Sequence, residues 1–234
     1  MPSDIAGQLT RVRARIDAAA RAAGRPPESI LLVAVSKTFH TAAIREARLA
    51  GQLDFGENKV QEGLQKITES ADLSIRWHLL GHLQRNKVRK AVAGFGTIQS
   101  VNSLDLLTRI DAVAAELGRS PDLLLQVDLA GETTKFGADP DAVREMLDGA
   151  TTLRAARVVG LMTIPPVPDS PEEARPWFRQ LRELRDRWIA AGVPPHLLRE
   201  LSMGMSGDFE VAIEEGATIV RVGTAIFGSR HVQH

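Results

Sequence analysis

The sequence predicts an α/β protein built as a single (β/α)8 barrel of the TIM type, with an extra helix at its N-terminus. Eight short apolar runs, rich in Val, Ile and Leu, alternate with amphipathic and charged stretches. The runs are continuously apolar, which is typical of parallel strands that are buried on both faces. The repeated alternation of strand and helix favours a closed barrel. An open, doubly wound parallel sheet is the alternative fold.

The individual elements follow from this pattern. Strands are predicted over residues 30–36, 53–55, 75–80, 97–101, 123–129, 158–164, 201–205 and 218–222. Helices are predicted over residues 42–50, 59–69, 83–93, 104–117, 139–152, 171–191 and 207–215. A leading helix is expected over 3–23, with Ser3 as its N-cap and Gly24 beyond its end. We expect this leading helix to cover the place that a final crossover helix would take.

The composition predicts one globular domain, residues 1–234, because no Pro-, Gly- or Ser-rich linker divides the chain. The 29 basic residues balance the 29 acidic ones, which argues against a nucleic-acid partner. The absence of Cys excludes disulfides, thiolate nucleophiles and Cys-ligated metals. No apolar run approaches the ~20 residues that span a bilayer, and no secretory signal is visible. We therefore expect a cytoplasmic protein with no membrane partner.

Lys37 is the first candidate functional residue. In barrels of this kind, function lies at the carboxyl ends of the strands, and Lys37 follows the charge-free run 30–36. A lysine at the mouth of an apolar barrel loses hydration, so the pKa of its ammonium group is expected to fall. A neutral amine is what imine formation with an aldehyde requires. The alternative is a lysine whose ammonium group simply reaches solvent.

Arg221 is the second candidate, because it interrupts an apolar strand. Strand alternation places its side chain on the face opposite Val220 and Val222. A buried guanidinium must find partners for its N–H groups. It could form an ion pair inside the barrel, for example with Glu57 or Asp128, or it could hold a ligand.

The loops after the last two strands are candidates for a phosphate site. They contain the stretch 203–208 and the pair Gly223-Thr224. Barrels often bind phosphate at these loops, where glycines allow close approach and hydroxyl groups donate hydrogen bonds. Alternatively, Ser206 or Asp208 is only the N-cap of the helix expected at 207–215.

Other polar groups carry weaker signals. His78 and His82 lie four residues apart at a strand end, but without a third ligand they make zinc a weak interpretation. The basic residues of 85–90 are best interpreted as a solvated helix face. Neither a P-loop nor a dinucleotide-binding glycine motif is present.

Six segments together resemble one known family, the pyridoxal phosphate homeostasis proteins, over almost the whole chain. They are VAVSKT (33–38), FGENKVQE (55–62), WHLLGHLQRNK (77–87), GLMTIP (160–165), LSMGMSGDF (201–209) and VRVGTAIFG (220–228). The sequence departs from the family after the fifth strand, where Asp128-Leu129-Ala130 stands in place of Asn and Ser. It also has Phe39 where the family often has Pro.

The resemblance implies a fold type III, alanine-racemase-like barrel that holds pyridoxal 5′-phosphate (PLP) as a Schiff base on Lys37. It further implies that Arg221 faces the pyridine nitrogen and that Asn58 lies near the ring. Ser206, Gly223 and Thr224 would hold the phosphate. A permanent positive charge at the pyridine nitrogen disfavours its protonation, which makes the ring a weaker electron sink.

The function implied by the resemblance is PLP homeostasis: the protein would hold PLP, buffer it and supply it to apo-enzymes, without dedicated catalysis. The alternative is a PLP-dependent amino-acid racemase reduced to one barrel domain. Alanine racemases add a second domain and use a Tyr base, whereas Tyr is absent from these 234 residues. A side activity through Lys37, or through His78 or His82, stays open. A third hypothesis is a regulator that senses PLP. We expect a monomer.

Overall fold

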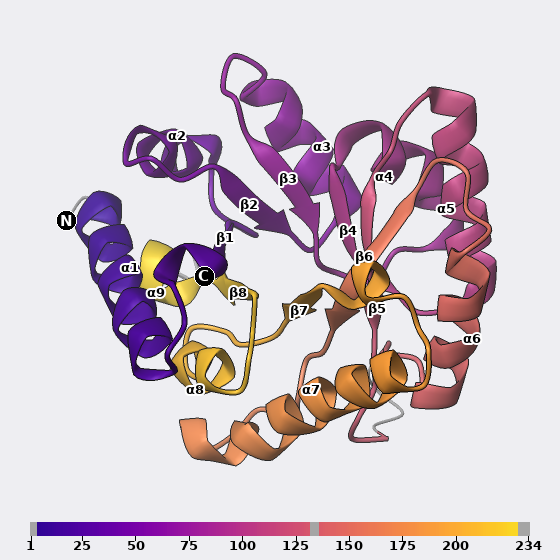
Figure 1. Ribbon diagram of the computed structural model, residues 1–234. Coiled ribbons are helices and arrows are strands. Elements are labelled where there is room, and N and C mark those ends of the chain that lie inside the picture. Colours follow the sequence, from indigo (N-terminus) through magenta and orange to yellow (C-terminus); the bar gives the residue numbers. More distant parts are fainter. Residues whose placement is uncertain (1–3, 132–135, 229–234) are drawn as a thin grey trace.

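The computed structural model describes residues 4–131 and 136–228, and these form a closed parallel barrel of eight strands in sequence order (Figure 1). The strands are β1 (Leu31–Val35), β2 (Asp54–Glu57), β3 (Arg76–Leu79), β4 (Thr97–Val101), β5 (Asp122–Gln126), β6 (Arg157–Met162), β7 (Glu200–Ser202) and β8 (Ile219–Val222). β1 pairs with β8, with Val33 opposite Arg221, and this pairing closes the barrel. The predicted barrel is confirmed, and the alternative of an open sheet is wrong.

Helices follow the strands and cover the outside of the barrel (Figure 1). The α-helices are α1 (Ile5–Ala22), α2 (Thr41–Leu49), α3 (Val60–Glu69), α4 (Val88–Gly94), α5 (Leu104–Leu117), α6 (Pro140–Ala150), α7 (Arg175–Ala190), α8 (Phe209–Glu214) and α9 (Thr224–Phe227). Short 3₁₀ turns are η1 (Pro27–Ser29), η2 (Arg85–Lys87), η3 (Pro171–Ala174) and η4 (Pro195–Leu198). Within the described ranges, every helix is too short or too polar to cross a bilayer.

The leading helix α1 packs against α2, α8 and α9, and so covers the junction of the first and last strands (Figure 1). This confirms the expectation that it takes the place of a final crossover helix. Its N-cap is Asp4, whose carboxylate accepts a hydrogen bond of 2.8 Å from the amide of Gly7. The predicted N-cap, Ser3, lies outside the described residues.

Element boundaries differ from the prediction mainly at the carboxyl ends of the strands. The apolar runs predicted strands to 129, 164 and 205, but β5, β6 and β7 end at Gln126, Met162 and Ser202. The excess residues are loop segments at the barrel mouth, several of them buried, and burial alone does not distinguish a strand from a buried loop. The helices predicted from 83 and 171 begin as the 3₁₀ turns η2 and η3. The four-residue helix α9 was not predicted.

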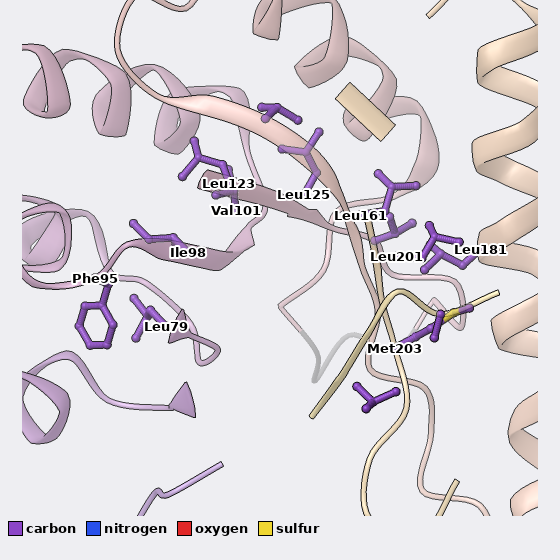
Figure 2. Packing of buried hydrophobic residues seen from close by; sticks show 14 of the residues in the cluster. Leu79, Phe95, Ile98, Val101, Leu123, Leu125, Leu161, Leu181, Leu201 and Met203 are labelled. Atoms are coloured by element: carbon purple, nitrogen blue, oxygen red, sulfur yellow. The ribbon is translucent and has the colours of Figure 1, made fainter. Parts of the chain in front are cut away.

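The buried apolar side chains form two separate clusters. The larger lies between the strands and the helices, and part of it is seen in Figure 2, where Leu201 of β7 and Leu181 of α7 are labelled. The smaller consists of Val33, Leu124, Val159, Met162 and Ile219. Since side chains alternate along a strand, the members of the second cluster fill the inside of the barrel.

Candidate functional site

A pocket of about 500 Å³ lies at the carboxyl ends of the strands, a size typical of small-molecule sites. All six residues that the sequence proposed are on its wall: Lys37, Asn58, Ser206, Arg221, Gly223 and Thr224. The other lining residues are Val35, Leu80, Gly81, His82, Gln126, Phe136, Ile164, Met205 and Gly207. These lining residues belong to seven of the eight strands or to the segments that follow them, and they meet at the rim where barrels carry function.

Lys37 lies two residues beyond the end of β1 and is half-buried in the pocket wall. The residues on either side of it are tied to acidic side chains. The hydroxyl of Ser36 donates to Glu57 Oε1 at 2.6 Å, and the amide of Thr38 donates to Glu62 Oε1 at 2.6 Å. Thr38 has a φ of 69°, a left-handed conformation that is uncommon for a residue with a side chain. These bonds hold the turn that presents Lys37.

A second lysine, Lys66 of α3, links these acidic groups behind the pocket. Its ammonium group donates to Glu57 Oε1, Glu62 Oε1 and the carbonyl of Ser36, each at 2.8 Å. Glu57 is fully buried, and among the described residues its Oε2 has no hydrogen-bond partner. Burial raises the pKa of Glu57 even though Lys66 opposes the change. Sequence reasoning missed this cluster, although the charged end of β2 and the i,i+4 pair Glu62–Lys66 were visible signals.

Arg221 is buried inside the barrel on β8. Its Nη1 donates to the hydroxyl of Ser202 at 2.6 Å, and its Nη2 donates to the carbonyl of Thr163 at 2.8 Å. Burial lowers the pKa of Arg221 to about 10, with the charge of Asp208 acting in the opposite direction. The guanidinium is therefore a cation at neutral pH, anchored through both terminal nitrogens.

The predicted internal ion pair of Arg221 is wrong for both named partners. The carboxylate of Glu57 is bound to Lys66 of α3, outside the barrel wall. Asp128 Oδ1 accepts hydrogen bonds from the amides of Ala130 and Gly131, at 3.0 and 3.1 Å. Asp128, where the sequence departs from the family, thus has a carboxylate that accepts hydrogen bonds within its own turn.

Ser206 joins the two loops proposed for phosphate. Its hydroxyl oxygen accepts hydrogen bonds from the amides of Gly223 and Ala225, at 3.2 and 3.3 Å. Asp208 Oδ1 accepts from the amide of Met205 at 2.6 Å, and its side chain makes no capping bond to α8. Asp208 is the N-cap residue of α8, as the alternative expects, but it occupies that position without a capping hydrogen bond. Two main-chain N–H groups at the start of α9 instead converge on one oxygen position.

Asn58 is positioned by the close approach of the next loop. A Cβ added at Gly81 would lie 2.1 Å from the main-chain oxygen of Asn58, so only glycine fits there. By contrast, a Cβ at Gly207 would meet nothing within 4 Å. The glycine after β3 thus brings Asn58 to the pocket wall, and space remains open beside the Ser206 loop.

The two histidines are separated by the fold. His82 lines the pocket and stacks on Phe136 with ring centroids 4.1 Å apart. His78 is buried, and its ring nitrogens face Asp54 and Gln99. Among residues 4–131 and 136–228, no group of three His, Cys, Asp or Glu side chains is arranged to hold a metal ion.

The basic residues after β3 lie on the surface, as the solvated-face interpretation expects. Arg85 pairs with Asp105 at 2.9 Å, and Arg89 pairs with Glu116. Both partners belong to α5, so these charges tie η2 and α4 to the next helix.

Residues 4–131 and 136–228 form a closed parallel barrel with a ligand-sized pocket at the carboxyl ends of its strands. Among these residues the pocket is lined by one lysine, one buried arginine and a Ser-Gly loop pair, and this arrangement defines a small-molecule-binding barrel protein. A family model for the alanine racemase N-terminal domain matches residues 8–231. Proteins named pyridoxal phosphate homeostasis protein from Aquifex aeolicus and Escherichia coli K12 are 43% and 42% identical to this chain. The alignments cover 95% and 97% of this chain and 97% of each relative. The chain belongs to the pyridoxal phosphate homeostasis proteins, within the alanine racemase N-terminal domain family.

Solved structures agree with this assignment. PipY of Synechococcus elongatus is 45% identical, and its structures without PLP and with PLP bound give TM-scores of 0.87 and 0.85. Each comparison covers 96% of this chain and all of PipY. An alanine racemase from Clostridium difficile shares the fold, with a TM-score of 0.73, at 17% identity, over 98% of this chain and 58% of the racemase.

Proposed function

We propose that this protein binds PLP in the barrel-mouth pocket and serves PLP homeostasis, buffering the cofactor and supplying it to apo-enzymes. The observation that carries the proposal is the meeting of all six sequence-proposed residues on the wall of one pocket. The relatives named for PLP homeostasis and the PLP-bound PipY structure support the same ligand.

The residues present fit the chemistry of PLP. The phosphate is an anion, and the amides of Gly223 and Ala225 already converge on an oxygen, that of Ser206. The open space beside Gly207 leaves room for the group. Ser206, Gly223 and Thr224 would hold the phosphate. Bound PLP supplies an aldehyde, and a ring that withdraws electrons from attached groups.

Lys37 would hold PLP covalently as a Schiff base, because it is the lysine that the described part of the chain places on the pocket wall. Asn58 would lie beside the ring. Arg221 would face the pyridine nitrogen, where its permanent charge disfavours ring protonation. This arrangement weakens the ring as an electron sink and favours storage over carbanion chemistry.

We propose that the protein has no dedicated catalytic reaction. These 234 residues contain no Tyr that could act as a second base opposite Lys37. Amino-acid racemisation is the competing function, and His82 is the histidine on the pocket wall that could support it. We further propose that the protein is a monomer and that it lies in the cytoplasm. A chain without Cys is compatible with that compartment.

Borohydride trapping tests this proposal. The purified protein is incubated with PLP, reduced and mapped by peptide mass spectrometry, beside Lys37→Ala and the control Lys59→Ala, which removes an exposed lysine. We expect one phosphopyridoxyl adduct, on Lys37, that is lost only in Lys37→Ala. An adduct-free wild-type protein, or adducts scattered over surface lysines, would refute the assignment. Racemisation of free amino acids that depends on Lys37 would replace homeostasis by the competing function.

A further inference from the structure

Polar side chains form a continuous chain through the inside of the barrel. Five strands each contribute one buried residue: Asp54 (β2), His78 (β3), Gln99 (β4), Ser202 (β7) and Arg221 (β8). The chain begins at the pocket, where Arg221 is part of the wall, and ends at Asp54, the first residue of β2. It therefore crosses the barrel from the carboxyl end toward the amino end of the strands.

Every link in this chain is within hydrogen-bond distance. Arg221 Nη1 is 2.6 Å from Ser202 Oγ, and Ser202 Oγ is 2.6 Å from Gln99 Oε1. Gln99 Nε2 is 3.2 Å from His78 Nδ1. His78 Nε2 is 3.1 Å from Asp54 Oδ1, which also accepts from Arg76 Nε at 2.8 Å. The Ser202–Gln99 link spans the barrel between strands that do not pair.

The donor and acceptor groups at its two ends fix the direction in which the hydrogen bonds of this polar chain run. A guanidinium only donates, so Ser202 must accept from Arg221 and give its own proton to Gln99 Oε1. The Gln99 amide nitrogen then donates to His78 Nδ1, which leaves the ring proton on Nε2, facing Asp54. Although burial opposes it, hydrogen bonds from His78 and Arg76 hold the pKa of Asp54 below its usual value. The far end is therefore an acceptor, as this direction requires.

We propose that Ser202, Gln99, His78 and Asp54 are positioning residues that orient the Arg221 guanidinium in the pocket. The Ser202 hydroxyl can rotate and the Gln99 amide can flip, and the acceptor nitrogen of His78 selects one arrangement of both. If Gln99 flips, its NH₂ group and the Arg221 N–H both donate to the Ser202 oxygen, the Ser202 proton loses its acceptor, and the anchor of Arg221 weakens. The proposal rests on the proposed function, because PLP is the ligand whose binding depends on the orientation of Arg221.

The first test needs neither PLP nor a variant. Nitrogen NMR of the protein labelled at histidine distinguishes the two ring tautomers. We expect His78 to carry its proton on Nε2 and to have an unprotonated Nδ1 at neutral pH. A proton on Nδ1 would overturn the proposed direction of the chain, whether or not the protein binds PLP.

The second test measures how substitutions in the polar chain, away from the pocket, affect the binding of PLP in the pocket. We expect His78→Leu and Gln99→Leu to raise the Kd for PLP about tenfold, the effect of losing one hydrogen bond to a charged group, and to shift the absorbance maximum of bound PLP. The matched control is Gln52→Leu, since Gln52 is also buried but donates to the main-chain oxygens of Leu32 and Asp54. It should leave the absorbance maximum unchanged.

The outcomes separate the two proposals. If the wild-type protein does not bind PLP, the proposed function fails, and the tautomer measurement alone decides whether the hydrogen bonds of the polar chain run in the proposed direction. If the wild-type protein binds PLP and both folded chain variants keep its Kd and absorbance maximum, the positioning role is overturned. If a variant does not fold, as judged by circular dichroism, Ser202→Ala takes its place. Its control is Ser70→Ala, since Ser70 is also buried but its hydroxyl donates to the main-chain oxygen of Lys66.

Discussion

At the scale of single residues, Lys37 is held by charges that stay behind the pocket wall. Glu57, Glu62 and Lys66 fix Ser36 and Thr38, the two neighbours of Lys37 in the chain. The cluster has two carboxylates and one ammonium group, and Glu57 keeps one oxygen without a partner among the described residues. The left-handed Thr38 is maintained by this cluster, so the orientation of Lys37 depends on residues that do not line the pocket.

Lys66→Met should therefore destabilise the protein strongly. Removing one partner leaves a buried carboxylate uncompensated, and such losses cost about 3–5 kcal/mol in the free energy of unfolding. Urea denaturation followed by circular dichroism measures the change, and Lys59→Met is the control because Lys59 is exposed. Equal losses in the two variants would show that the cluster contributes no special stability.

Three of the residues that the structure places on the pocket wall could be proposed one by one, because each stands out against its local sequence. Lys37 ends a charge-free run, Arg221 interrupts an apolar strand, and Ser206 lies between glycines. The partners of these residues could not be predicted, because they depend on which strands face each other across the barrel. The Ser202–Gln99 bond joins residues 103 positions apart, and no local pattern in the sequence encodes that pairing.

At the scale of elements, three arginines of α7 converge on one carboxylate at the end of α8. Glu215, at the end of α8, accepts contacts from three arginines of α7: Arg175 at 3.2 Å, Arg179 at 2.9 Å and Arg182 at 3.0 Å. Only 5% of the Glu215 side chain is exposed. Although burial opposes it, hydrogen bonds from Arg179 and Arg175 hold the pKa of Glu215 below its ordinary value.

Glu215→Gln should lower the free energy of unfolding by about 1–3 kcal/mol at neutral pH, because hydrogen bonds to a charged group are lost. A lowered pKa stabilises the fold above the ordinary value of 4.5, and this stabilisation is lost as the pH falls through the lower folded value. The difference between the wild type and the variant should thus shrink below that value. Thermal unfolding at a series of pH values measures it, and a constant difference down to acid pH would contradict this account.

Helices and strands were predictable where the hydrophobic pattern ends at the same residue as a capping signal. Helix α5 begins after Ser103, whose hydroxyl caps it, and ends at Gly118 in the left-handed conformation, so both signals stand in the sequence. Strand ends were less predictable, because the loops at the pocket are as apolar as the strands that lead into them. Their buried residues serve the pocket and the core at once.

At the scale of the whole molecule, ligand binding should appear as added thermal stability. A ligand that binds only the folded state, at about 100 times its Kd, adds ~2.7 kcal/mol to the free energy of unfolding. For a domain of this size that corresponds to a rise in Tm of roughly 5–10 °C. We expect this rise with PLP in the wild type and a smaller one in Lys37→Ala, measured by differential scanning fluorimetry. A wild-type Tm that does not respond to PLP would count against the pocket as a PLP site.

Closure of the barrel between β1 and β8 also has a consequence for synthesis on the ribosome. β1 is the first strand of the barrel to leave the exit tunnel, but the partner that covers its free edge, residues 219–222, is the last of the eight strands to be made. Until then the main-chain N–H and C=O groups along that edge have no strand to pair with, and such edges invite association with other chains. The nascent protein therefore carries an open edge until β8 has been made, and the polysome is where this barrel is most exposed to aggregation.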